Sequence, residues 1–143
     1  MIKPIPEGWH SVTPRLVVHD VARLVEFLKE AFGAKGDFRT DVPSVIRIGD
    51  SVVMVSSVGP RDAMPAFLYL YVDDVDTTYQ RALEAGAVSL EEPNDVPYGD
   101  RRGMVQDPCG NVWQIATHIE DVAPDISADA QRASPYSNVT GEK

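Results

Sequence analysis

Apolar and polar positions along the chain predict a first series of five elements. Residues 12–18 alternate between two sets of side chains, with Arg15 in one set and Leu16 in the other, as expected for a β-strand. Apolar residues then recur at helical spacing between Asp20, which can cap the helix, and Gly33, which ends it. Three short strands are predicted next, at residues 38–40, 45–48 and 51–57. The first half of the chain therefore has the order βαβββ.

The second half of the chain repeats this order. Residues 67–72 form the next predicted strand, and Asp74 caps the next helix. Three further strands are predicted, at residues 88–90, 102–106 and 111–117, with residues 93–100 as a long connection. Val72 and Asp74 follow Val18 and Asp20 at the same offset of 54 residues, which indicates an internal repeat. Since a helix covers only one face of a sheet, the sequence predicts an α+β protein whose two modules pair around a cleft.

Composition restricts the partners and the compartment. The 143-residue chain carries a net charge of −9, which repels the phosphates of nucleic acids and of anionic membranes, so neither is expected as a partner. No apolar run approaches the length of a membrane span, and the N-terminal residues lack the apolar stretch of a signal peptide. A single cysteine, Cys109, excludes an intrachain disulfide and suits a reducing compartment. We therefore expect a cytoplasmic protein.

Three motifs lie at matching places in this order of elements: Phe-Gly-Ala at 32–34, Val-Asp-Asp-Val at 72–75 and Asp-Pro-Cys-Gly-Asn-Val-Trp at 107–113. Together with the repeat they resemble the vicinal oxygen chelate superfamily of glyoxalases, bleomycin-resistance proteins and extradiol dioxygenases, and its PhnB-like branch is the nearest match. The resemblance covers residues 8–122. It implies a glyoxalase/bleomycin-resistance fold, in which two paired βαβββ modules form a cleft, and it implies a homodimer.

The expected domain boundaries follow from the same resemblance. Residues 1–124 are predicted to form a single domain, with modules at about 9–58 and 66–120. Residues 125–143 have little apolar content and are predicted to be a tail, with a short helix at 127–133.

Enzymes of this superfamily hold one divalent metal in the cleft, usually with two His and two Glu from the first and last strands of each module. The register of the repeat places Thr13, Met54, Phe67 and Gln114 at these four positions. Thr and Gln are weak neutral oxygen donors, and Met and Phe are poor ligands for such an ion. We therefore expect neither a metal nor another cofactor. Whether the protein is an enzyme stays open, since the superfamily's chemistry depends on a metal that polarises the substrate.

The same positions predict a cleft suited to a small apolar or aromatic ligand. Met54 and Phe67 make its floor apolar, and Tyr69 and Tyr71 share the face of Phe67 by strand alternation. His118 shares a strand face with Gln114 and lies toward one end of the cleft. The predicted cleft residues are Thr13, Arg15, Met54, Phe67, Tyr69, Tyr71, Tyr98, Gln114 and His118. The predicted function is binding of a small molecule without the usual metal.

Each of these interpretations has an alternative. The three aromatic residues of strand 67–72 pack a closed core if no cleft exists. Arg15 on the cleft side either pairs with an Asp or Glu of the chain or awaits an anionic ligand. The protein is an enzyme of lyase, isomerase or dioxygenase type if displaced ligands such as His10 and His118 hold a metal, or if Tyr or His acts as a metal-free acid and base. An interaction module without a small ligand is the third class.

Three remaining features are predicted to be structural. Cys109 lies in a tight turn, with no motif around it that would lower the pKa of its thiol. Trp113 alternates away from Gln114 and should lie in the core. The charged residues at 91–92 and 100–102 are interpreted as a solvated loop cluster.

Overall fold

The computed structural model describes residues 2–122. The predicted tail at 125–143, with its short helix at 127–133, lies outside the described residues. Within them the chain forms, in order, β1 (Arg15–Val18), α1 (Val21–Phe32), β2 (Ser44–Ile48), β3 (Ser51–Ser57), β4 (Phe67–Tyr71), α2 (Val75–Glu84), β5 (Val88–Asp95), β6 (Asp100–Gln106) and β7 (Val112–His118).

The N-terminal module is a three-stranded sheet with α1 on one face. Its strand order is β1-β3-β2, with β1 parallel and β2 antiparallel to β3. The carboxylate of Asp20 accepts a hydrogen bond from the backbone N–H of Arg23 at 3.1 Å, and α1 ends at Gly33, whose φ is 67°. Both predicted ends of the helix are therefore confirmed.

The predicted strand at residues 38–40 is wrong. The backbone N–H of Arg39 donates to Ser44 Oγ at 2.8 Å, so this segment closes on itself as a loop and forms no ladder with a neighbouring strand. The neighbouring Lys35 forms only an isolated bridge with Arg47. The first module consequently has the order βαββ within the described residues.

The C-terminal module is a four-stranded sheet in the order β4-β7-β6-β5, with β4 parallel to β7. Strand β5 is longer than predicted, because it continues through Pro93 by two register shifts, between Ser89 and Glu91 and between Glu91 and Asn94. Strand β6 begins at Asp100, two residues earlier than predicted. The connection between these strands is therefore shorter than the predicted loop.

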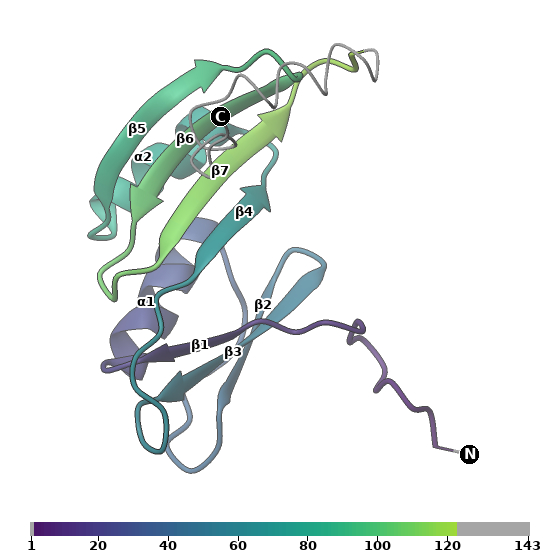
Figure 1. Cartoon of the computed structure of the whole chain (residues 1–143), viewed down its shortest axis with the longest axis vertical. Coiled ribbons are helices and arrows are strands. Elements are labelled where there is room, and N and C mark those ends of the chain that lie inside the picture. Colours follow the sequence, from purple (N-terminus) through teal and green to yellow (C-terminus); the bar gives the residue numbers. More distant parts are fainter. Residues whose placement is uncertain (1, 123–143) are drawn as a thin grey trace, which may run out of the picture.

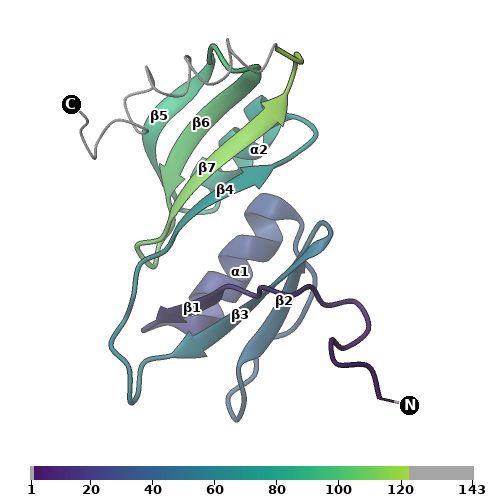
Figure 2. The same ribbon diagram turned by 45° about the vertical axis from the view of Figure 1, so that its right-hand side comes forward.

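The two helices lie next to each other behind the sheets, and each sheet turns its other face away from them (Figures 1 and 2). The core between helices and sheets is built from fully buried aliphatic and aromatic side chains, among them Leu16, Leu24, Phe27, Ile46, Val105 and Ile115. The α+β class and the two-module organisation are confirmed. Within residues 2–122, neither helix has the length and apolar character needed to cross a membrane.

The turn between β6 and β7 explains the motif at 107–113. The buried Asp107 accepts hydrogen bonds from the backbone N–H groups of Cys109 (2.8 Å) and Asn111 (3.0 Å) and from Trp113 Nε1 (2.9 Å). Asn111 in turn accepts one from the backbone N–H of Ala66 at 2.9 Å, next to the start of β4. The turn therefore fixes how β4 meets β7. The predicted turn position of Cys109 and core position of Trp113 are confirmed.

Candidate ligand-binding site

One face of the C-terminal sheet points away from the helices; we call it the open face, and on β4 it carries three exposed aromatic side chains. Phe67, Tyr69 and Tyr71 are 59%, 38% and 60% exposed, while Leu68 and Leu70 alternate toward the core. Within residues 2–122, β4 pairs with β7 alone, so it is the edge of its sheet. The alternative that these aromatic residues pack a closed core is wrong for the described chain. We call these three side chains the aromatic face.

One buried carboxylate holds two of these rings. Asp100, at the start of β6, is 2% exposed, and its Oδ2 accepts hydrogen bonds from Tyr69 Oη at 2.6 Å and Tyr71 Oη at 2.8 Å. Strand β7 lies between β4 and β6, and the register places the small Ala116 beside Tyr71. A small residue there lets the tyrosine side chains reach across β7. The two rings lie 5.2 Å apart, centroid to centroid.

His118 completes the group around Asp100. Its Nδ1 lies 2.9 Å from Asp100 Oδ1, and its Nε2 lies 2.7 Å from Asp121 Oδ1, so both ring nitrogens already have a carboxylate partner. The register of β6 and β7 pairs Asp100 directly with His118. His118 is the last residue of β7 and lies at one end of the open face.

These contacts shift the acid–base properties of the group. Burial and then the hydrogen bond to Asp100 raise the pKa of Tyr71 to about 12, and the same causes hold the pKa of Tyr69 well above its usual range. Burial acts to raise the pKa of Asp100, but the hydrogen bonds from Tyr69, His118 and Tyr71 outweigh it, so this pKa lies below its usual value. The hydrogen bonds to Asp100 and then Asp121 raise the pKa of His118. Both tyrosines are therefore neutral donors at physiological pH.

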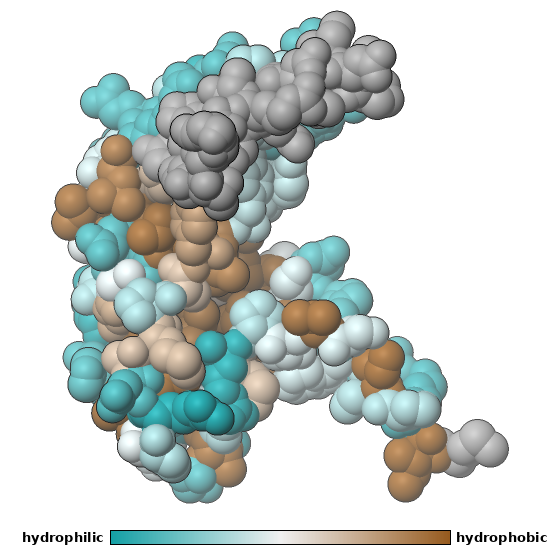
Figure 3. Space-filling view, in the orientation of Figure 1, coloured by the Kyte–Doolittle hydropathy of each residue, from teal (hydrophilic) through white to brown (hydrophobic). Residues whose placement is uncertain are grey.

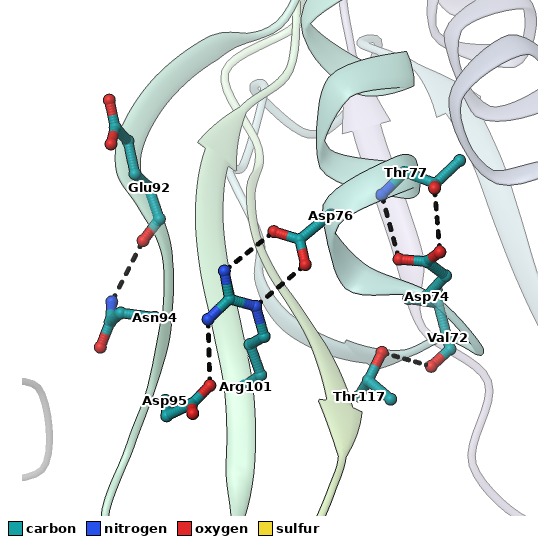
Figure 4. Close-up of polar contacts among 9 residues, drawn as sticks. All are labelled: Val72, Asp74, Asp76, Thr77, Glu92, Asn94, Asp95, Arg101 and Thr117. Atoms are coloured by element: carbon teal, nitrogen blue, oxygen red, sulfur yellow. Dashed lines mark hydrogen bonds and ion pairs between the residues drawn. The ribbon is translucent and has the colours of Figure 1, made fainter.

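Residues 100–102 are not the solvated loop cluster that the sequence suggested, because they belong to β6. Arg101 points toward the helix side, where its guanidinium donates to both oxygens of Asp76 at 2.9 and 3.1 Å and to Asp95 at 3.0 Å (Figure 4). Arg102 points to the open face, is buried, and donates to Tyr98 Oη at 2.5 Å. Tyr98 therefore lies beside this face through its contact with Arg102.

The predicted metal positions fall two on each module. Met54 lies between Arg15 and Val45 in the register of the N-terminal sheet, and Thr13 lies two residues before the start of β1. Phe67 and Gln114 lie on the open face of the C-terminal sheet, where Gln114 is buried beside Tyr69 in register. Within residues 2–122, no three His, Cys, Asp or Glu side chains come together in a group that could hold a metal ion. His10 lines a groove beside Thr13 on the first module, whereas His118 ends β7 of the second.

A groove of about 790 Å³ runs where the two modules meet. One wall is the turn between β2 and β3, and the other is β4 with the start of α2. Tyr69 and Tyr71 line it, so two of the three side chains of the aromatic face border this groove. The space-filling view shows hydrophobic surface gathered in the middle of the molecule, between the two modules (Figure 3).

Comparison with known proteins agrees with this fold. The family model described as Glyoxalase/Bleomycin resistance protein/Dioxygenase superfamily matches residues 10–115. The chain belongs to this superfamily. An uncharacterized protein of Mycobacterium bovis is 32% identical over 133 residues, which cover 80% of this chain and 88% of that protein.

Two solved structures of the same fold are similar to the chain. The structure of TioX from Micromonospora sp. ML1 has a TM-score of 0.62 and 22% sequence identity, and the alignment covers 76% of this chain and all of TioX (100%). A glyoxalase/bleomycin resistance protein/dioxygenase family enzyme from Burkholderia phytofirmans PsJN has a TM-score of 0.63 and 19% identity, with 73% and 95% coverage. At this level of identity the likeness extends to the fold alone.

Sequence reasoning missed Asp100, which organises the candidate site. Asp100 and Arg102 share strand parity with Met104, and all three are buried on the open face of β6. Extending the predicted strand at 102–106 by two residues would have placed Asp100 on the same face. The sequence did not indicate the role of Asp100, because a run of charged residues such as 100–102 is usually solvated.

Proposed function

We propose that the aromatic face binds a small apolar or aromatic molecule, and that the protein does so without the divalent metal used by enzymes of its superfamily. The observation that carries the proposal is the exposure of Phe67, Tyr69 and Tyr71 in a chain whose other β-sheet aromatic, Trp113, is buried. Exposed aromatic side chains that gather on one strand offer a large apolar surface to a ligand. We also propose that the chain belongs to the PhnB-like branch of the superfamily.

The hydrogen bonds to Asp100 support a binding role for this face. They hold Tyr69 and Tyr71 in place before any ligand arrives, so less rotamer freedom is lost on binding. Because both hydroxyls already donate to Asp100, each offers a ligand only its oxygen lone pairs. The face therefore favours flat molecules that stack on the rings over strongly hydrogen-bonding ones.

The donor set supports the metal-free part of the proposal. Thr13, Met54, Phe67 and Gln114 lack the imidazole and carboxylate groups that bind zinc, nickel, iron or manganese. The nearby carboxylate of Asp100 is already bonded to two tyrosines and a histidine. We expect the purified protein to contain less than stoichiometric metal by elemental analysis and to keep its melting temperature in a chelator. About one metal ion per chain, or a chelator-dependent melting temperature, would contradict this expectation.

The binding proposal is tested by calorimetric titration with neutral flat probes such as indole and 2-naphthol. Phe67→Ser removes one ring from the aromatic face and is expected to weaken binding about tenfold, which corresponds to roughly 1.4 kcal/mol. Phe38→Ser is the matched control, since Phe38 is a similarly exposed phenylalanine on a loop of the first module. Equal affinities of the two variants for the probe would reject the aromatic face as the binding site.

A second candidate function is metal-free acid–base catalysis, and the Asp100–His118 hydrogen bond of 2.9 Å favours it. Two features make it the weaker candidate. Both nitrogens of His118 are engaged by carboxylates, and the pKa values of Tyr69 and Tyr71 are raised, so neither tyrosine is a base at neutral pH. Consumption of a bound ligand that stops in His118→Asn, while binding persists, would favour the enzyme.

We also propose that a second copy of the chain completes the cleft, as a homodimer. In the single chain the aromatic face lies at a sheet edge, and Met64 and Val45 are further exposed apolar residues of the first module. Contact between two copies would bury such surface. Sedimentation velocity across a wide concentration range is expected to give twice the chain mass of 15.7 kDa. A species of single-chain mass at all concentrations would contradict the dimer.

A further inference from the structure

Another hollow lies on the N-terminal module, away from the aromatic face. It has a volume of about 240 Å³ and is bounded by β1, the end of β3 and the segment that follows β3. That segment is fixed to β1 by hydrogen bonds from the backbone N–H of Val58 to Val18 O (3.2 Å) and from that of Met64 to Val17 O (3.1 Å). We call it the β1–β3 groove; its lining residues are Arg15, Val17, Ser56, Ser57, Pro60, Arg61 and Met64.

Two arginines of this groove have no acidic partner in the described part of the chain. Within residues 2–122, the guanidinium of Arg15 makes one weak side-chain contact, from Nη2 to Met54 Sδ at 3.7 Å. The guanidinium of Arg61 has no hydrogen bond or ion pair to the described part of the chain. In contrast, Arg39 pairs with Asp41 at 3.3 Å in the neighbouring hollow. Since the chain carries a net charge of −9, acidic side chains are abundant, yet none of those described lines the β1–β3 groove.

A buried hydroxyl provides an independent observation at the same place. Ser56 Oγ is shielded from solvent and has no hydrogen-bond partner among the described residues. Leaving a buried polar group unpaired costs about 1–3 kcal/mol, so a folded protein normally satisfies it. An acceptor atom of a ligand reaches this hydroxyl once the side chains that cover it move aside, and it then gives the hydroxyl the partner that the described residues do not supply.

We propose that the β1–β3 groove binds the anionic group of a small molecule, a carboxylate or a phosphate, with Arg15 and Arg61 as its charge partners and Ser56 as a hydroxyl donor. Guanidinium groups bind both anions through charge-assisted hydrogen bonds. Val17, Pro60 and Met64 give the rest of the groove apolar walls, which suit a short carbon chain attached to the anion. Of the two alternatives for Arg15, this proposal corresponds to the anionic ligand, since Arg15 pairs with no Asp or Glu of the described chain.

The test uses calorimetric titration of the full-length protein at low ionic strength with two probes, inorganic phosphate and propionate. Arg15→Gln and Arg61→Gln are each expected to weaken binding at least about tenfold, and added salt should weaken binding to the wild type. Both residues are exposed, so both variants should fold. Arg39→Gln is the matched control and should bind like the wild type. Tighter binding of propionate would assign the site to carboxylic acids, and tighter binding of phosphate would assign it to phosphate esters.

Ser56→Ala separates a binding role from a structural one. Removal of an unpaired buried hydroxyl should raise the melting temperature, while the loss of a donor should weaken binding of the preferred probe several-fold. The proposal is overturned if neither probe binds, if Arg15→Gln and Arg61→Gln bind like the wild type, or if Arg39→Gln loses as much affinity as they do. Because the probes are not aromatic and the groove is on the other module, failure here is distinguishable from failure of the aromatic face.

Discussion

Two buried aspartates of the C-terminal module allow a sharp test of which residues serve the fold and which serve the proposed site. Asp100 and Asp107 are 2% and 4% exposed, and each accepts at least three side-chain or backbone hydrogen bonds. The donors differ in their surroundings. The donors to Asp107 include the buried Asn111 and Trp113. The partners of Asp100 are the side chains of Tyr69, Tyr71 and His118, which water can reach.

The expected losses of stability follow from this difference. In Asp107→Ala, the indole N–H of Trp113 and the N–H groups of Asn111 are left buried without an acceptor, at about 1–3 kcal/mol each, so the free energy of unfolding should fall by about 4 kcal/mol. In Asp100→Ala, water replaces the carboxylate at Tyr69 and Tyr71, and only the net worth of the charge-assisted bonds is lost. The expected fall is therefore about 1–2 kcal/mol.

Urea unfolding at neutral pH, followed by circular dichroism, measures both losses by linear extrapolation. Titration with indole then measures binding by the folded protein. Asp100→Ala should bind the probe several-fold more weakly, because its tyrosine rings are no longer held, while folded Asp107→Ala should bind like the wild type. The reasoning fails if Asp100→Ala is destabilised as much as Asp107→Ala, or if only Asp107→Ala loses affinity.

Three further predictions concern single residues. The raised pKa of His118 means that its contribution to stability is complete below about pH 6.5 and is lost as pH rises through the folded-state pKa; the urea midpoint of His118→Gln should lack this pH dependence. Gly99→Ala should lower the unfolding free energy by about 2 kcal/mol or more, since φ is 97° and a Cβ would collide with Glu120 O, whereas Gly59→Ala has open space and should be neutral. Burial chiefly raises the pKa of Cys109 to about 11, so iodoacetamide at pH 8 should alkylate the native thiol far more slowly than the urea-unfolded one; equal rates would contradict this.

Much of the fold could be predicted from the sequence because its signals are local. Strand β3 has the predicted bounds, and Asp20 with Gly33 marks the ends of α1, because capping depends on a few neighbouring residues. The failures depend on distant partners. Residues 38–40 have strand-like composition, but a hydrogen bond to Ser44 closes them into a loop. Strand β5 runs through Pro93 because register shifts accommodate a residue that cannot donate to the ladder.

The sequence predicted which side chains of β4 share one face of the sheet, but it did not predict the central role of Asp100. Alternation along β4 correctly placed Phe67, Tyr69 and Tyr71 together, since it depends only on strand geometry. The role of Asp100 depends on β7 lying between β4 and β6, and no pattern along the chain reveals that order of strands. The sequence also could not show that Arg15 has no acidic partner within residues 2–122, because any of 22 acidic residues was available to it.

The network around Asp100 bears on the proposal that the protein binds a ligand without a divalent metal. In a metal enzyme of this superfamily, an ion fixes the ligand and polarises it, and carboxylates and imidazoles are directed at the ion. Here the carboxylate and the imidazole of the C-terminal module are directed at each other and at two tyrosine hydroxyls. The carboxylate of Asp100 therefore holds two side chains of the aromatic face in place. Such a surface gains affinity from stacking and from its rigidity, and neither requires a reactive group on the ligand.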